Sequence, residues 1–383
     1  MELKKLGLEK ITRENNTIKN VGWTVGNYCN ARCKHCYSWK VRRGKDDLHN
    51  GEVDKIVGEL LKLGVETLNL GGNEPIFTNG PEIEKSVLPY MVKKIHESGI
   101  TVGITTYGIT ATELYRLDKE AFDLVNDWDI SIDSPFKEEH DRNRGSGIYA
   151  HALSALDLCK KKGKTHSMVM CGMNWNTSDR HINGLVELAK DFDSEIRINT
   201  LKPTEKHHNE LFPNSKQFYT SSHLLMSKTK PVVIGESLLA SLCGQEAHGC
   251  PCGVNSMRIH SKTPEGTVPI SPCVYLHALK VGDLLKDDIF EIVNSEQFNQ
   301  MRLRNLQIPK ECHNKNCPYI ETCRGGCAAR AYLVNGSLDS VDPYCIKQTE
   351  KKFSFPTFSK EQPNHEGVRV HENYLCTYIG KPK

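Results

Sequence analysis

Three cysteines stand close together near the start of the chain. Cys29, Cys33 and Cys36 have the spacing C-x3-C-x2-C. A cubane iron–sulfur cluster usually takes four thiolates, so three thiolates leave one iron free to bind another group. A metal site with an open coordination position is typical of catalysis rather than of a structural role. The spacing therefore predicts a catalytic iron–sulfur cluster.

Two simpler interpretations of these cysteines stay open: a zinc knuckle, or ordinary buried thiols. A structural zinc site closes tetrahedrally and needs a fourth Cys or His at a similarly close spacing. His35 lies between two of the cysteines, but its position directly beside Cys36 makes tetrahedral closure awkward. The iron–sulfur interpretation is therefore preferred.

Cysteine is unusually common in this chain. There are 15 cysteines among 383 residues, most of them within residues 29–36 and 243–345. The N-terminus has no apolar signal segment, and no apolar run approaches the ~20 residues of a membrane span. We therefore expect a soluble, cytoplasmic protein without a membrane partner, whose cysteines bind metal rather than form disulfides. The net charge of +3 is too small to indicate a nucleic-acid partner.

Between residues 21 and 201, short apolar or β-branched runs alternate with amphipathic segments. The alternation predicts an α/β fold in which six parallel strands and their crossover helices form a partial (β/α)6 TIM-like barrel. In such folds, ligands bind beyond the carboxyl ends of the strands. Strands are expected at residues 21–25, 65–70, 100–106, 129–133, 166–173 and 195–201, and helices at 53–63, 85–98, 149–162 and 180–191.

A glycine-rich motif follows the second expected strand. The run Gly71-Gly72-Asn73-Glu74-Pro75 has adjacent glycines, which let the backbone approach a ligand closely, although a simple turn is the plainer interpretation. Together with the cysteine spacing, this run resembles the radical S-adenosylmethionine superfamily, whose motif is Gly-Gly-Glu-Pro; Asn73 is an insertion. The resemblance implies that the open iron holds S-adenosylmethionine and that one electron from the cluster releases a 5′-deoxyadenosyl radical.

The same resemblance implies a set of cofactor contacts. Thr105 is included by location only, because Tyr107 stands where relatives commonly have Asn. An Arg fork suits a carboxylate bidentately, and a solvated polar loop is the alternative for each residue beyond the fourth strand. The implied contacts are His35 near the adenine, Gly71, Gly72 and Glu74 at the amino group, Ser131 and Asp133 at the ribose and carboxylate, Arg142 or Arg144 at a carboxylate, and Thr105 without an assigned side-chain role.

The second cysteine zone resembles the SPASM extension, a small Cys-rich α+β domain that commonly binds two auxiliary [4Fe–4S] clusters. A zinc ribbon is the alternative. In SPASM domains the cysteines of the two clusters interleave along the sequence. The resemblance therefore implies that the first auxiliary cluster takes Cys252, Cys273 and Cys327, with Cys243 or Cys250 completing it. The second takes Cys312, Cys317, Cys323 and Cys345.

Four cysteines lie outside these sets: Cys159, Cys171, Cys376 and whichever of Cys243 and Cys250 is free. Cys159 is expected in the apolar core. Cys171 ends an expected strand, where a thiol facing a radical could donate a hydrogen atom; Cys250 or Cys243 is the other candidate donor.

These patterns divide the chain into five parts. They are an N-terminal segment at 1–20, the radical S-adenosylmethionine barrel at 21–201, a linker at 202–242, the SPASM domain at 243–345 and a tail at 346–383.

The resemblance implies an enzyme, because SPASM-bearing relatives mostly modify ribosomal peptides. We hypothesise hydrogen abstraction from a carbon centre of a peptide or peptide-like natural-product precursor. A sugar or aminoglycoside epimerase or dehydrogenase is the alternative, favoured because only 28 residues precede Cys29 and leave no room for a leader-binding module. A zinc-stabilised interaction protein is the alternative from another class. Sulfatase maturation is disfavoured, since Val274 stands where those relatives have an acidic residue. Expected partners are the substrate, a flavodoxin- or ferredoxin-type electron donor and a separate leader-binding protein.

Overall fold

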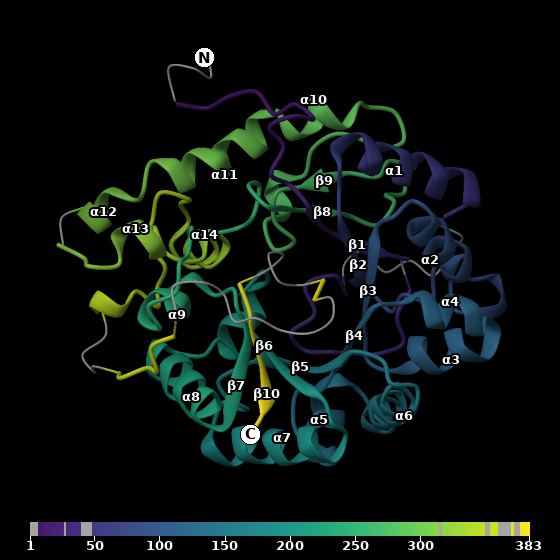
Figure 1. Ribbon diagram of the computed structural model, residues 1–383, viewed down its shortest axis with the longest axis horizontal. Helices are drawn as coiled ribbons and strands as arrows, with labels where there is room; N and C mark the ends of the chain where they lie inside the picture. The colour runs from purple at the N-terminus through teal and green to yellow at the C-terminus, as the bar shows by residue number, and fades with distance from the viewer. Residues whose placement is uncertain are drawn as a thin grey trace.

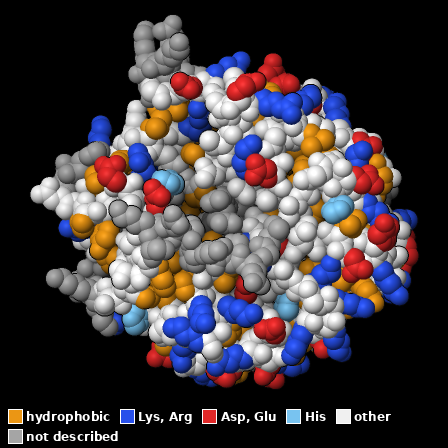
Figure 2. Space-filling view, in the orientation of Figure 1, with side chains coloured by type: hydrophobic (Ala, Val, Ile, Leu, Met, Phe, Trp, Pro, Cys, Tyr) orange, Lys and Arg blue, Asp and Glu red, His pale blue; other side chains and the backbone are white. Residues whose placement is uncertain are grey.

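The computed structural model describes residues 7–26, 28–39, 48–313, 316–348, 353–358, 369–370 and 376–383. Parts of the expected N-terminal segment and of the tail lie outside these ranges. Within them, no helix is both long enough and apolar enough to cross a bilayer. Figure 2 shows basic and acidic side chains interspersed over the described surface of one face.

One mixed sheet organises the molecule, with the strand order β7-β10-β6-β5-β4-β3-β2-β1-β8-β9. The strands from β1 to β6 are parallel neighbours in chain order, which confirms the predicted six-stranded partial barrel. Their bounds are β1 Asn20–Val25, β2 Thr67–Gly72, β3 Thr101–Thr106, β4 Asp127–Ser131, β5 His166–Gly172 and β6 Glu195–Thr200.

Helices cover the outer face of these strands (Figure 1). Each buries one apolar stripe at helical spacing, as in α1, where Val53, Ile56, Val57, Leu60 and Leu63 are buried. The helices around the barrel are α1 Asn50–Leu63, α2 Leu88–Glu97, α3 Ile109–Leu117, α4 Lys119–Leu124, α5 Lys137–Arg144, α6 Ile148–Lys161 and α7 Asp179–Asp191.

The sheet extends beyond the six strands at both edges. The segment 202–242, expected as a linker, contains helix α8 (Ser215–Lys228), strand β7 (Thr229–Ile234) and helix α9 (Ser237–Leu242). Strand β10 (Tyr378–Pro382), from the C-terminal tail, lies between β6 and β7 and is antiparallel to both (Figure 1). The last strand of the tail therefore belongs to the barrel sheet.

At the other edge, the Cys-rich region joins the sheet through β8 (Ser256–Ile259), which pairs with β1 in parallel, and β9 (Ile270–Ser271). Its helices are short and lie at one side of the sheet (Figure 1). They are α10 Ile289–Val293, α11 Glu296–Leu306, α12 Lys310–His313, α13 Ile320–Cys323 and α14 Ala328–Asn335.

Candidate active site and iron–sulfur centres

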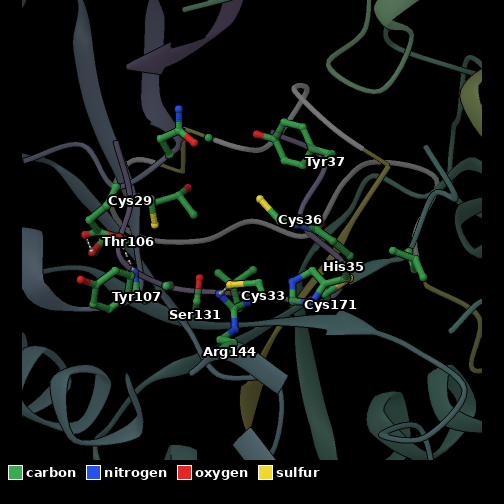
Figure 3. Close-up of a pocket in the computed structure, with 18 of the residues that line it drawn as sticks. Cys29, Cys33, His35, Cys36, Tyr37, Thr106, Tyr107, Ser131, Arg144 and Cys171 are labelled. Carbon is green, nitrogen blue, oxygen red and sulfur yellow. Dashed lines mark hydrogen bonds between the residues drawn. The ribbon is translucent and has the colours of Figure 1, made fainter. Parts of the chain in front are cut away.

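A cavity of about 160 Å³ opens at the carboxyl ends of the parallel strands, where ligands bind in this class of fold. The loop after β1 brings Cys29, Cys33 and Cys36 to one wall, and Figure 3 shows their sulfurs pointing toward a common space. The other walls come from the ends of β2 to β6 and from the Cys-rich region. The lining residues are Cys29, Ala31, Cys33, His35, Cys36, Tyr37, Gly72, Asn73, Glu74, Thr105, Thr106, Tyr107, Ser131, Arg144, Val169, Cys171, Asn199, Leu201, Lys202 and Tyr275.

Backbone hydrogen bonds hold the cysteine loop against the end of α5. The Arg32 N–H donates to the Arg144 carbonyl (2.8 Å), and the Lys34 N–H donates to the Asn143 carbonyl (3.1 Å). Tyr107 supports the loop from the other side, because its hydroxyl donates to the Asn30 side chain. Tyr107 therefore supports the cysteine loop from the position where relatives commonly have Asn.

The glycine motif ties the cysteine loop to β1 and β2. Gly72 has φ of +94°, and a Cβ there would lie 2.5 Å from Thr24, so only glycine fits without displacement. The inserted Asn73 donates to the Gly26 carbonyl (3.0 Å) and accepts from the Ser38 hydroxyl (3.1 Å). The Ser38 oxygen also lies 3.4 Å from the Cys36 sulfur. Asn73 thus connects the ends of two strands with the loop that carries the cysteines.

Glu74 is buried at the start of α3. Its carboxylate accepts hydrogen bonds from the backbone N–H groups of Tyr107 and Thr110 (3.1 Å each) and from the hydroxyls of Thr106 and Thr110. A negative charge is favourable at a helix N-terminus. Burial nevertheless raises the pKa of Glu74, although these four donors oppose that effect. Glu74 thus lines the cavity while its carboxylate fixes β3 to α3.

Asp133 and Arg144 form a buried ion pair beneath the cysteine loop. The Arg144 Nη2 donates to Asp133 Oδ1 (3.1 Å), and Asn143 and the Cys171 backbone N–H donate to the same carboxylate. Burial alone would raise the pKa of Asp133, but the Arg144 guanidinium holds it well below its usual range. Burial lowers the pKa of His35 to about 4, so the imidazole is neutral at physiological pH.

The structure brings most of the expected cofactor contacts to one cavity. His35, Gly72, Glu74, Thr105, Ser131 and Arg144 line it, whereas Gly71, Asp133 and Arg142 do not. Asp133 is fully buried behind Arg144, and Arg142 is exposed on α5. Sequence patterns gave no signal for Asn199, Lys202 and Tyr275, which come from the end of β6 and from the Cys-rich region.

Five cysteines form one buried group beside this cavity. Cys250, Cys252, Cys273, Cys327 and Cys376 pack together with Met301 and Leu276. The Cys252 side chain lies close to those of Cys250 and Cys273, and the Cys376 side chain lies close to those of Cys250 and Cys327. Tyr275 contacts this group and also lines the cavity.

Cys243 does not belong to this group. Its sulfur lies 3.9 Å from the Met226 sulfur in the apolar core, and burial raises its pKa to about 12. Of the two alternatives, the structure therefore places only Cys250 at the first auxiliary site.

The remaining expected ligands gather around a second, apolar cavity. Cys312, Cys317, Cys323 and Cys345 line it together with Leu238 and Ile320. No disulfide is present among the described cysteines. Among the residues that the structure describes, no three or more His, Cys, Asp or Glu side chains are arranged to hold a single metal ion.

Of the three candidate hydrogen-atom donors, Cys243 lies in the apolar core and Cys250 lies in the buried cysteine group, and neither lines the active-site cavity. Beyond Cys29, Cys33 and Cys36, Cys171 is the thiol that the described residues present to the cavity. Cys159 is fully buried in the apolar core, as expected.

The donor set fits an iron–sulfur cluster with an open position. Three thiols that form no disulfide share one wall of a cavity that continues past them. The opposite wall holds the buried side-chain oxygen of Asn199, which has no hydrogen-bond partner among the described residues. Thiolates are the usual cluster ligands, and the remaining space is available for a second molecule.

Family comparisons agree with this geometry. Residues 23–186 match the radical SAM superfamily, and residues 250–327 match SPASM, an iron–sulfur cluster-binding domain. The chain belongs to the radical SAM superfamily and carries a SPASM domain. It is an enzyme whose cofactors are S-adenosylmethionine, the [4Fe–4S] cluster of the superfamily and auxiliary iron–sulfur clusters.

Individual relatives cover most of the chain. It is similar to the mycofactocin maturase MftC of Mycolicibacterium smegmatis, with 27% identity over 334 residues that cover 85% of this chain and 82% of the relative. It is also similar to the AdoMet-dependent heme synthase of Oleidesulfovibrio alaskensis, with 25% identity and coverage of 87% and 88%.

Two solved structures share the fold. They are anSMEcpe with bound AdoMet (TM-score 0.65, 16% identity, covering 85% of this chain and 93% of that one) and Streptococcus suis SuiB bound to its precursor peptide SuiA (TM-score 0.63, 13% identity, covering 89% and 77%).

Proposed function

We propose that this enzyme abstracts a hydrogen atom from a carbon centre of a peptide or peptide-like precursor. The similarity to the mycofactocin maturases supports a peptide substrate, because it extends over 85% of this chain and more than four-fifths of the M. smegmatis protein. The observation that carries the proposal is the cavity itself. It joins the three cysteines to Lys202, which forms no ion pair among the described residues, and to Asn199, whose side-chain oxygen accepts no hydrogen bond among them.

Lys202 supplies a cation to the cavity wall. Its side chain is buried, and its ammonium lies 5.3 Å from the centroid of the Tyr275 ring. Within the described ranges it has no ion pair or hydrogen bond. A buried ammonium without an anionic partner is costly, so a carboxylate of the substrate is its natural partner. Asn199, close by on the same wall, offers its unpartnered oxygen to an N–H group.

These two groups match the chemistry of a peptide. A peptide carries backbone N–H groups and a terminal or side-chain carboxylate, which the Asn199 oxygen and the Lys202 ammonium would bind. A neutral or cationic sugar offers no carboxylate to Lys202. The wall therefore favours a peptide over an aminoglycoside.

When bound, the cluster and S-adenosylmethionine supply a 5′-deoxyadenosyl radical that removes the hydrogen atom. The chain holds both partners in place and shields them from water. We assign cofactor contacts to the expected residues that line the cavity, which are His35, Gly72, Glu74, Thr105, Ser131 and Arg144. Cys29, Cys33 and Cys36 would hold the cluster, and Cys312, Cys317, Cys323 and Cys345 the second auxiliary cluster.

We propose that the first auxiliary cluster exchanges electrons with the cavity, because Tyr275 packs against its cysteines and also lines the cavity. We propose a flavodoxin- or ferredoxin-type protein as the electron donor and a separate protein as the leader-peptide binder. We propose a cytoplasmic location, because cysteines that bind metal rather than form disulfides suit a reducing compartment.

Product analysis tests the proposal. Anaerobically reconstituted, reduced enzyme is incubated with S-adenosylmethionine and either a candidate precursor peptide or an aminoglycoside intermediate. We expect the peptide to increase the yield of 5′-deoxyadenosine and to change in mass or stereochemistry. The Cys33→Ala variant is the control that should produce neither change. Stimulation by the sugar and not by peptides would overturn the proposed substrate.

A further inference from the structure

The first auxiliary site holds one thiol more than a cubane cluster needs. Cys250, Cys252, Cys273, Cys327 and Cys376 all belong to one buried group, whereas four thiolates complete a [4Fe–4S] cluster. Four of these cysteines lie within residues 250–327. The fifth, Cys376, comes from the C-terminal tail and is only 5% exposed.

The sheet holds Cys376 in this position. The carbonyl of the next residue, Thr377, accepts hydrogen bonds from the backbone N–H groups of Gly235 and Glu236 (2.9 Å each). The Thr377 hydroxyl donates to the Ile198 carbonyl (3.1 Å), and Tyr378 begins strand β10. Contacts with β6 and with the end of β7 therefore fix the backbone beside Cys376.

Cys376 also lies between two other thiols of the group. Its side chain lies close to those of both Cys250 and Cys327, within the same buried group. Cys327 is the N-cap of α14, and its N–H donates to the buried Asp342 carboxylate (2.8 Å), so this neighbour is equally well fixed. A cluster bound by Cys327 would lie within reach of Cys376.

Of the five cysteines, Cys250 is the least suited to bind the cluster. A single residue, Pro251, separates it from Cys252, whereas the cluster-binding runs of ferredoxins place at least two residues between successive ligands. Its backbone is restrained as well: the Cys250 N–H donates to the Asn305 side chain (3.3 Å), and the Asn305 amide donates to the Cys250 carbonyl. Little freedom remains for both thiols of this pair to reach separate corners of one cluster.

We propose that Cys376 is a ligand of the first auxiliary cluster, together with Cys252, Cys273 and Cys327, and that Cys250 is not. The cluster then links the SPASM domain to the C-terminal strand of the barrel sheet. Because ligand binding to metal is coupled to folding, loading of this cluster stabilises the pairing of β10 with β6 and β7. The proposal rests on the cofactors of the family and is independent of the substrate.

Iron content tests the ligand assignment directly. Three cubane clusters contain about 12 irons. Cys376→Ala should bind about 8 irons per chain after anaerobic reconstitution, since this cluster would lack its fourth protein ligand and, unlike the cluster at Cys29, Cys33 and Cys36, has no S-adenosylmethionine to occupy the open corner. Cys250→Ala should keep the full content. Cys243→Ala is the matched control, because it removes an equally buried thiol that lies outside the group.

Hydrogen exchange at the β10 amides gives a readout that does not depend on catalysis. In reconstituted enzyme, we expect exchange at the amides of residues 378–381 to be at least about tenfold faster in Cys376→Ala than in Cys250→Ala or the unmodified enzyme. Exchange in α1 and α6 should stay unchanged in all variants, which separates loss of the cluster from general misfolding.

Full iron content in Cys376→Ala would overturn the proposal. Loss of about four irons in Cys250→Ala would also overturn it, because Cys250 would then be a ligand. Loss of iron confined to Cys376→Ala, with faster exchange confined to β10, is the supporting result.

Discussion

Arg144 and Asp133 are paired in the interior directly beneath the cysteine loop. The guanidinium Nε lies 2.5 Å from one carboxylate oxygen and Nη2 lies 3.1 Å from the other. The third guanidinium nitrogen, Nη1, lies 3.8 Å from the Cys33 sulfur. One arginine thus neutralises a buried carboxylate and touches a predicted cluster ligand.

Replacing Arg144 by Met should destabilise the protein by about 3–5 kcal/mol, because Asp133 would be left as an unpaired buried charge. The exposed Arg142, two residues earlier on α5, provides the control, and Arg142→Met should change the free energy of unfolding by less than about 0.5 kcal/mol. Urea unfolding of the iron-loaded proteins under anaerobic conditions measures both values. Equal effects of the two substitutions would contradict a structural role for the ion pair.

Glu74 gives a second prediction, because its carboxylate receives four donors at the start of α3. A Gln at this position presents N–H groups to donors, so Glu74→Gln should lower the free energy of unfolding by about 2 kcal/mol or more. The matched control is Glu82→Gln, whose side chain is 63% exposed. The denaturation midpoints of the two variants decide the matter: if they coincide, the carboxylate does not hold β3 to α3.

The third prediction concerns pH. Burial and the neighbouring Asp129 carboxylate raise the pKa of Asp127 to about 8. Its Oδ2 accepts from the Val370 N–H (3.0 Å), while Oδ1 has no partner among the described residues. The unfolded chain releases this proton near pH 4. Stability due to Asp127 is therefore present at low pH and is lost as the pH rises toward 8.

Asp127→Asn removes this dependence. The stability of the variant relative to the unmodified enzyme should rise by about 1.4 kcal/mol per pH unit between about pH 5 and 7. Asp157→Asn, at a half-exposed position on α6, should show no such trend. Parallel stability curves for Asp127→Asn and the unmodified enzyme would show that the carboxyl is ionised in the folded protein.

Lys202 provides the fourth prediction, which concerns the proposed substrate. Loss of a charge-assisted hydrogen bond costs about 1.5–3 kcal/mol, so Lys202→Met should raise the KM for the peptide about 10- to 100-fold. Lys202→Arg should restore part of the loss. The exposed Lys206, four residues later, supplies the control variant Lys206→Met.

Cleavage of S-adenosylmethionine in the absence of peptide shows whether Lys202 binds the substrate or the cofactor. Because we place it at the substrate, the slow cleavage of S-adenosylmethionine without peptide should proceed at an unchanged rate in Lys202→Met. If that reaction fails as well, Lys202 serves the cofactor and the assignment to the substrate is wrong.

Periodicity and motif spacing allowed much of the barrel to be predicted. The six parallel strands follow local patterns, since β-branched runs and amphipathic helices alternate at regular intervals. Their ends were less predictable: β2 and β4 are displaced by two residues from the expected bounds, because pairing with neighbouring strands sets where a strand ends. Helix α5 was missed because its residues are almost all polar.

Tertiary structure decided what no local pattern encodes. The sequence by itself placed Cys29, Cys33 and Cys36 close together, because residues a few positions apart in one loop cannot lie far apart. It could not place Cys376 beside Cys327 or Lys202 beside Tyr275, since those pairs depend on how distant segments pack. The spacing of the cysteines therefore predicted the local part of the catalytic centre. The positions of Lys202 and Cys376 could be determined only from the tertiary structure.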